Sequence, residues 1–176
     1  MKKQIILIMT DTTRKDMLGC YGNPKMITPN LDRLSAEGIR YENAYTCQPV
    51  CGPARSAIFT GTFPHTNGEV TNCVAMGDNI KTVGQRLTDN GIHCGYIGKW
   101  HLDASELNFS PHPKSGAREW DAYTPPGERR QGFDYFLSYG ACDDHLDPHY
   151  WLNDETQIRP GKWSAEYETD KAIEYM

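Results

Sequence analysis

Two common features are missing from this sequence: a long apolar run and an excess of positive charge. No stretch of the 176 residues approaches the roughly 20 apolar residues that a membrane-spanning helix needs. Lysine and arginine number 18 against 23 aspartate and glutamate, which gives a net charge of −5. A chain without a basic stripe has little to attract nucleic acid or an anionic membrane surface. We therefore expect a globular domain that binds neither.

A secretion signal is also missing at the N-terminus. The apolar run Ile5–Met9 is followed at once by Thr10 and Asp11, so it is too short for the apolar segment of a signal peptide. A buried strand is the better interpretation. The compartment stays open: cytoplasmic is the default, and a periplasmic or secreted protein whose leader has been removed is the alternative.

Cysteine pairs with the Cys-x-x-Cys spacing are absent, which removes the usual signal for a zinc knuckle or a thioredoxin-like site. Six cysteines among 176 residues are also too sparse for a disulfide-rich domain. We expect most of them to be small buried apolar side chains.

Apolar strands are present, and polar residues follow them. Residues 5–9 form a continuous β-branched run, as in a parallel strand that is covered on both faces, and residues 92–97 predict a second strand. Asp11 follows the first run, and Lys99 and His101 follow the second. Strands that alternate with helices predict an α/β fold, in which sites gather at the carboxyl ends of parallel strands.

Helices are predicted between and after these strands. Residues 28–38 have Pro29 in the first turn and a closing glycine, and residues 39–46 return as an extended segment. Residues 81–90 predict a short helix with Val83 and Leu87 facing inward. Residues 169–176 predict the first turns of an amphipathic helix.

A cysteine and an arginine lie close together in the stretch from 47 to 61. Cys51 stands four positions before Arg55, and Cys47 stands eight before it. A tyrosine-phosphatase loop needs five residues between its cysteine and the arginine that binds the phosphate group. Here three residues separate Cys51 from Arg55, and seven separate Cys47 from it. A phosphatase loop is therefore excluded by spacing.

The eleven residues from Cys51 to Gly61, CGPARSAIFTG, resemble the signature of the sulfatase family instead. In that family the cysteine is oxidised to formylglycine by a formylglycine-generating enzyme or an equivalent. Cys47 has no arginine at the fourth position, so only Cys51 qualifies. Pro53 would place Cys51 at the start of a helix, where the free N–H groups favour an anion such as a sulfate ester. Arg55 adds a fork-shaped donor nearby.

The sequence around Asp11 resembles the first metal segment of the same family. There an aspartate binds a divalent cation, commonly calcium, through oxygen. By this resemblance Asp11 and the modified Cys51 are the expected metal ligands. Thr12 stands where many members have a second ligand, so the ligand set is incomplete.

Two further segments match family patterns. By resemblance to the first, GKWHL at 98–102, Lys99 contacts the sulfate group and His101 hydrogen-bonds the formylglycine hydroxyl. The second is FPHTNG at 63–68, in which His65 either contacts substrate or caps a turn.

Residues 103–161 are rich in proline, glycine, aspartate, histidine and aromatic side chains. We expect a substrate-lining insert here, in which His145 and His149 contact sugar hydroxyls; a solvated acidic loop is the alternative. Asp144 and His145 imitate the second metal segment of the family but lack its glycine, so we expect no metal there.

The resemblance covers nearly the whole chain and implies the N-terminal part of a sulfatase catalytic domain, incomplete at its C-terminus. Its fold would be alkaline-phosphatase-like, with a mixed, largely parallel sheet flanked by helices. The implied activity is hydrolysis of a sulfate ester on a small molecule or, preferably, a glycan. The alternatives are a phosphonate or phosphate ester hydrolase of the same superfamily and an inactive fragment that lacks the second half of the metal site.

Overall fold

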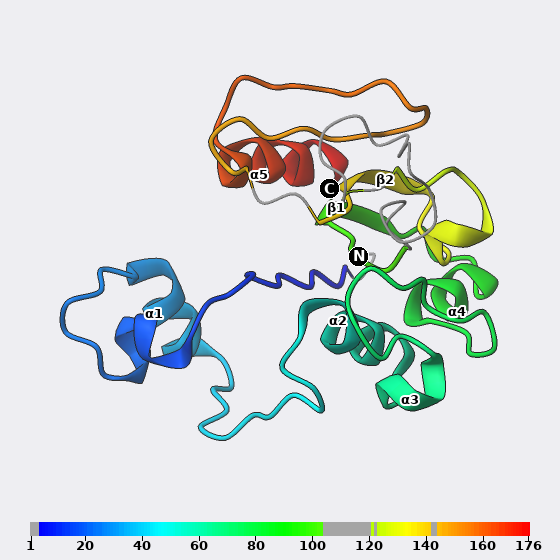
Figure 1. The fold of residues 1–176 in the computed structure, drawn as a ribbon. Coiled ribbons are helices and arrows are strands. Elements are labelled where there is room, and N and C mark those ends of the chain that lie inside the picture. Colours follow the sequence, from blue (N-terminus) through cyan, green and yellow to red (C-terminus); the bar gives the residue numbers. More distant parts are fainter. Residues whose placement is uncertain (1–3, 104–120, 122, 142–143) are drawn as a thin grey trace. The chain divides into compact units, whose positions relative to one another are not determined.

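The computed structural model describes residues 4–103, 121, 123–141 and 144–176. The chain divides into two compact units, Met1–Tyr45 and Thr46–Met176. Figure 1 colours the first unit in blue to cyan, and the remaining elements belong to the second unit.

The first unit is built around helix α1, Pro29–Glu37, as the sequence predicted. Proline suits the first turn because its missing N–H would have no partner there. The Thr28 hydroxyl donates to Asp32 Oδ1 at 3.0 Å and accepts from the Gly19 N–H at 2.9 Å, which ties the start of α1 to the preceding turn. Two short 3₁₀ turns complete the unit: η1, Lys15–Met17, and η2, Gly19–Tyr21.

The predicted strand at residues 5–9 is wrong. These residues form no strand, and Ile5 and Ile8 are 90% and 80% exposed. A strand requires a neighbour that accepts and donates its backbone hydrogen bonds. Among the described residues the only paired strands belong to the second unit. An apolar run therefore indicates a tendency toward burial, but it does not show that a neighbouring strand is available for pairing.

The second unit contains a parallel strand pair, which confirms the predicted α/β class. Strand β1, Gly95–Lys99, pairs with β2, Tyr135–Tyr139, with Gly95 opposite Tyr135 and Lys99 opposite Tyr139. The predicted strand thus begins three residues late, but Lys99 and His101 do lie at its carboxyl end. Figure 1 shows β1 in green beside β2 in yellow.

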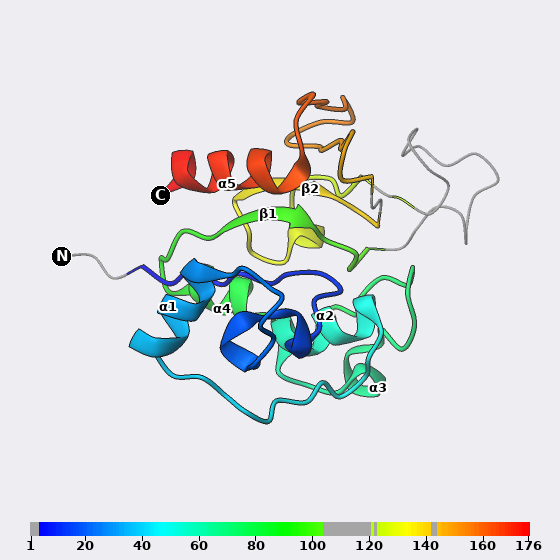
Figure 2. The same cartoon turned by 90° about the vertical axis from the view of Figure 1, so that its left-hand side faces the viewer.

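Helices lie on both sides of this pair. Figures 1 and 2 show α5 on one side of the strands and α2 and α4 on the other. None of the helices in the described residues is long and apolar enough to cross a membrane. The bounds are α2, Cys51–Thr60; α3, Pro64–Asn67; α4, Val83–Asp89; and α5, Ser164–Tyr175, with a 3₁₀ turn η4, Glu128–Arg130.

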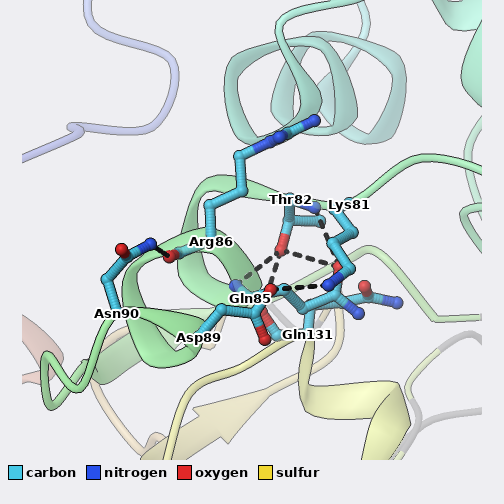
Figure 3. A network of polar contacts seen from close by, with 7 residues as sticks. All are labelled: Lys81, Thr82, Gln85, Arg86, Asp89, Asn90 and Gln131. Atoms are coloured by element: carbon cyan, nitrogen blue, oxygen red, sulfur yellow. Dashed lines mark hydrogen bonds and ion pairs between the residues drawn. The ribbon is translucent and has the colours of Figure 1, made fainter.

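Helix α4 begins with a reciprocal cap at Thr82. The Thr82 side chain accepts the Gln85 N–H, and the Gln85 side chain accepts the Thr82 N–H at 2.9 Å (Figure 3). The Thr82 hydroxyl also donates to the Gln131 carbonyl at 2.9 Å. The prediction that Val83 faces inward is wrong, since Val83 is exposed and the buried positions are Thr82 and Gly84. A Cβ at Gly84 would lie 2.6 Å from the Gln131 carbonyl oxygen, so this face needs glycine.

Two aromatic clusters form the core of the second unit. They use opposite faces of β2, because neighbouring side chains of a strand alternate. The first cluster consists of Phe59, Trp100, Leu102 and Phe136, and the second of Leu137, Tyr139, Tyr150 and Trp151. The range 103–161, where we expected substrate-lining loops, therefore also supplies β2 and much of the core. Its role in lining a substrate site stays a prediction.

Candidate active site

Cys51 is the first residue of α2, as the position of Pro53 predicted. Val50 precedes it in an extended conformation, and the Ala54 N–H closes the first turn on the Val50 carbonyl at 2.9 Å. The Gly52 N–H donates to Asn72 Oδ1 at 2.8 Å. The half-buried Cys51 thus lies at the end of a helix where the backbone dipoles favour negative charge.

Arg55 connects this helix to the carboxyl end of β1. Its side chain is 5% exposed, and Nη1 donates to the Lys99 carbonyl at 2.7 Å and to the Tyr96 hydroxyl at 3.2 Å. The Tyr96 hydroxyl also donates to the Lys99 carbonyl. Two sequence segments that resemble one family, 51–61 and 98–102, are therefore in direct contact through buried polar groups.

His101 contacts Cys73, which lies beside the residue that binds the first turn of α2. His101 Nε2 lies 3.8 Å from Cys73 Sγ, and both residues have a left-handed backbone, with φ of 54° and 62°. Such conformations are uncommon outside glycine and gather at functional sites. Asn72, which binds the Gly52 N–H, is the chain neighbour of Cys73. Residues 72 and 73 therefore link the first turn of α2 to the buried His101.

Glu69 is an acidic residue of this region that the sequence analysis missed. It is fully buried, and burial raises the pKa of its carboxyl to about 9, with Arg55 opposing the rise and Asp103 adding to it. The residues Asn72, Cys73 and Tyr96 were missed as well. No local pattern marks Glu69, because it is the fold that brings its carboxyl into the space that a side chain at position 52 would need.

The other histidines named as substrate contacts have different surroundings. His65 is exposed on α3 and stacks on Phe63. His145 is exposed, and its Nδ1 lies 3.1 Å from the Ser164 hydroxyl at the start of α5. His149 is buried, with Nε2 2.6 Å from Asp121 Oδ2. His145 and His149 line one small pocket together, whereas their contact with substrate stays a prediction.

Asp11 lies in the first unit, exposed, with its backbone carbonyl 3.4 Å from the Thr13 hydroxyl. A carboxylate is the hard oxygen donor that calcium prefers, so the side chain suits the predicted ion. Within residues 4–103, 121, 123–141 and 144–176, no group of three or more His, Cys, Asp or Glu side chains could hold a metal. Asp11 is therefore one potential ligand rather than a complete site.

Comparison with known proteins agrees with the two contacting segments. The sequence profile of the Sulfatase family matches residues 3–176. The chain is 40% identical over 152 residues to the uncharacterized sulfatase YidJ of Escherichia coli K12, which covers 86% of this chain and 25% of that protein. It is 33% identical to an endo-4-O-sulfatase of Bacteroides thetaiotaomicron, over 92% of this chain and 34% of that protein.

Solved structures confirm the alkaline-phosphatase-like sulfatase fold. A Bacteroides fragilis protein that shares the name YidJ superposes with a TM-score of 0.81 at 38% identity, over 91% of this chain and 37% of its own. A protein solved in complex with its substrate D-glucosamine-2-N,6-O-disulfate superposes with a TM-score of 0.70 at 30% identity, over 92% of this chain and 28% of its own. The chain thus spans between a quarter and about a third of the curated relatives named above. It belongs to the sulfatase family.

Proposed function

We propose that the protein hydrolyses a sulfate ester on a carbohydrate, with a formylglycine made from Cys51 as the nucleophile. The observation that carries this proposal is the hydrogen bond from Arg55 to the Lys99 carbonyl, because it joins the nucleophile helix to the Lys99–His101 segment. The named activities of relatives support a carbohydrate substrate: one is an N-acetylglucosamine-6-O-sulfatase, 31% identical over 99% of this chain.

The chemistry explains why an aldehyde is needed at position 51. A thiol that attacked sulfur would keep the sulfate group and have no internal way to release it. A hydrated aldehyde carries two hydroxyls on one carbon. One hydroxyl oxygen bonds to sulfur while the alcohol leaves with a proton; the second then loses its proton, the carbonyl reforms, and the C–O bond to sulfate breaks. The aldehyde is regenerated, and one water is consumed per cycle.

Three side chains would serve this reaction. Arg55, fixed by its two hydrogen bonds, would orient the hydroxyls of residue 51. Lys99, at the end of β1, would offset negative charge on the transferring sulfate group. His101 would take or relay a proton, since imidazole is the side chain that most often serves as a general acid or base.

A divalent cation belongs to the proposal as well. Sulfatases in general use one together with formylglycine. Asp11 and an oxygen of residue 51 would hold the cation, which we expect to be calcium, and it would supply positive charge near the sulfate oxygens.

The predicted substrate contacts complete the site. His65, His145, His149 and the range 103–161 would face the sugar. The formylglycine-generating enzyme is the partner that the reaction requires.

Matched aryl esters test the reaction class. The protein would be produced together with a formylglycine-generating enzyme and assayed with an aryl sulfate and the corresponding aryl phosphonate ester. We expect a higher kcat/KM for the sulfate. Faster turnover of the phosphonate would instead support a phosphonate hydrolase of the same superfamily.

A further inference from the structure

The carboxyl group of Glu69 is buried and forms no hydrogen bond with the described residues. The residue follows α3 and is fully buried, and neither carboxyl oxygen has a hydrogen-bond partner among the described residues. Leaving a buried polar group without a partner is costly, and native proteins rarely do so without a reason such as a bound group. The surroundings of Glu69 show what that group would be.

The carboxyl lies at the first turn of α2. A Cβ built on Gly52 would be 2.2 Å from Glu69 Oε1 and 3.3 Å from Asn72 Oδ1. Glu69 and Asn72 therefore both line the residue that follows Cys51. Asn72 already accepts the Gly52 N–H, whereas the Glu69 oxygens have no such partner among these residues. This turn is also where the helix favours a bound anion.

The charged groups that act on Glu69 are Arg55 and Asp103. Arg55 favours the carboxylate and Asp103 disfavours it, but burial is the largest influence and raises the pKa of Glu69 to about 9. Asp103 is itself paired with Arg129, which reduces its effect. At neutral pH Glu69 therefore keeps its proton and offers one donor and one acceptor.

We propose that Glu69 is a further binding residue of this centre, whose carboxyl donates a hydrogen bond to an oxygen of the sulfate group at the first turn of α2. The inference rests on the proposed function, because it takes the sulfate group as the anion that binds there. A protonated carboxyl stabilises an anion, whereas a carboxylate in the same place would repel it. Proteins use buried neutral acids as donors in this way.

Inorganic sulfate tests the proposal without any need for turnover. Its apparent affinity is read from the rise in melting temperature with sulfate concentration, in the wild type, Glu69→Gln and Glu69→Ala. At pH 7 we expect Glu69→Gln to bind about as well as the wild type, because the amide keeps one uncharged donor. Glu69→Ala should bind about tenfold more weakly, the effect of one lost hydrogen bond to a charged group.

A second pH separates a proton donor from a merely structural side chain. At pH 10 the wild type should lose about tenfold in affinity relative to Glu69→Gln, because only the carboxyl ionises. Glu168→Gln is the matched control: burial raises the pKa of this carboxyl too, but Glu168 accepts a hydrogen bond from Tyr150 at 2.9 Å, and its replacement should leave sulfate affinity unchanged.

Results that contradict the role of Glu69 differ from results that contradict the proposed sulfatase activity. Equal affinity of the wild type and Glu69→Ala, equal weakness of both Glu69 variants, or no stabilisation of the wild type by sulfate would each overturn the role of Glu69. A protein that binds sulfate through Glu69 but releases none from any sulfate ester would keep this inference and lose the proposed activity.

Discussion

Arg55 Nη1 donates a hydrogen bond to the carbonyl of Lys99 at 2.7 Å, inside the protein. The guanidinium group thereby connects the first turns of α2, which contain Cys51, to the carboxyl end of β1. One buried side chain thus positions both the proposed nucleophile and the residues that follow the strand. The contact ties the catalytic proposal to the stability of the second unit.

Arg55→Lys should therefore reduce both stability and activity. Nη1, at the far end of the arginine side chain, donates both bonds, and the shorter lysine places its ammonium elsewhere, so the bonds to Lys99 and Tyr96 are lost. We expect a loss of about 2 kcal/mol in the free energy of unfolding, measured by urea denaturation, and a fall in kcat for sulfate release. The exposed Arg33→Lys is the control and should change stability by less than about 0.5 kcal/mol. An unchanged midpoint for Arg55→Lys would contradict the structural role.

Glu69 should make the protein less stable as the pH rises. The folded state keeps the proton up to a pKa of about 9, whereas the unfolded state releases it near 4.5. Between these values the unfolded state binds fewer protons, so stability falls with pH by up to about 1.4 kcal/mol per unit. Glu69→Gln should remove this slope, so that its stability relative to the wild type increases from pH 5 to pH 9. A difference that does not vary with pH would show that Glu69 is ionised when buried.

Thr82→Ala should destabilise the second unit through α4. The substitution removes the acceptor for the Gln85 N–H and the bond to the Gln131 carbonyl. A lost cap typically costs about 1–2 kcal/mol. Thr82→Ser keeps the hydroxyl and should recover most of that loss in thermal unfolding. If serine were as destabilising as alanine, packing of the methyl group rather than the cap would be responsible.

Gly84→Ala should also destabilise α4, although alanine is the better helix former. The added Cβ would lie 2.6 Å from the backbone oxygen of Gln131, which belongs to a buried residue with little freedom to move. Overpacking of this kind costs about 1–3 kcal/mol, which exceeds the helix propensity gained. A rise in melting temperature for Gly84→Ala would contradict the close packing of α4 against residue 131.

The sequence predicted the features that depend on local pattern. Helix α1, the start of α2 at Cys51 and the position of Lys99 and His101 at the end of β1 follow from proline placement, glycine stops and apolar runs. The strand at residues 5–9 failed because pairing depends on a distant partner.

The missed residues of the site have the same physical origin. Glu69 carries no local signal of its burial: it follows a short helix in a polar stretch, and only the fold brings it to Gly52. The two core clusters likewise depend on β2, which lies in a range whose composition indicated loops. Long-range contacts of this kind cannot be read from one sequence without its fold.

Cys51 and Cys47 provide a matched pair for the central claim. Both cysteines are followed two positions later by a proline. Only Cys51 begins α2, whereas Cys47 is exposed and precedes that helix. Cys51→Ser should abolish sulfate release in a host that makes formylglycine, whereas Cys47→Ser should leave it unchanged. Loss of activity in Cys47→Ser alone would reverse the assignment.

The most direct measurement is mass spectrometry of the tryptic peptide Tyr41–Arg55, with fragment ions that separate positions 47 and 51, combined with an assay of sulfate release. Batches made with different amounts of formylglycine-generating enzyme give different degrees of conversion. We predict that conversion occurs at position 51 alone and that sulfate release is proportional to it. Equal sulfate release from protein in which residue 51 is still cysteine would contradict the account.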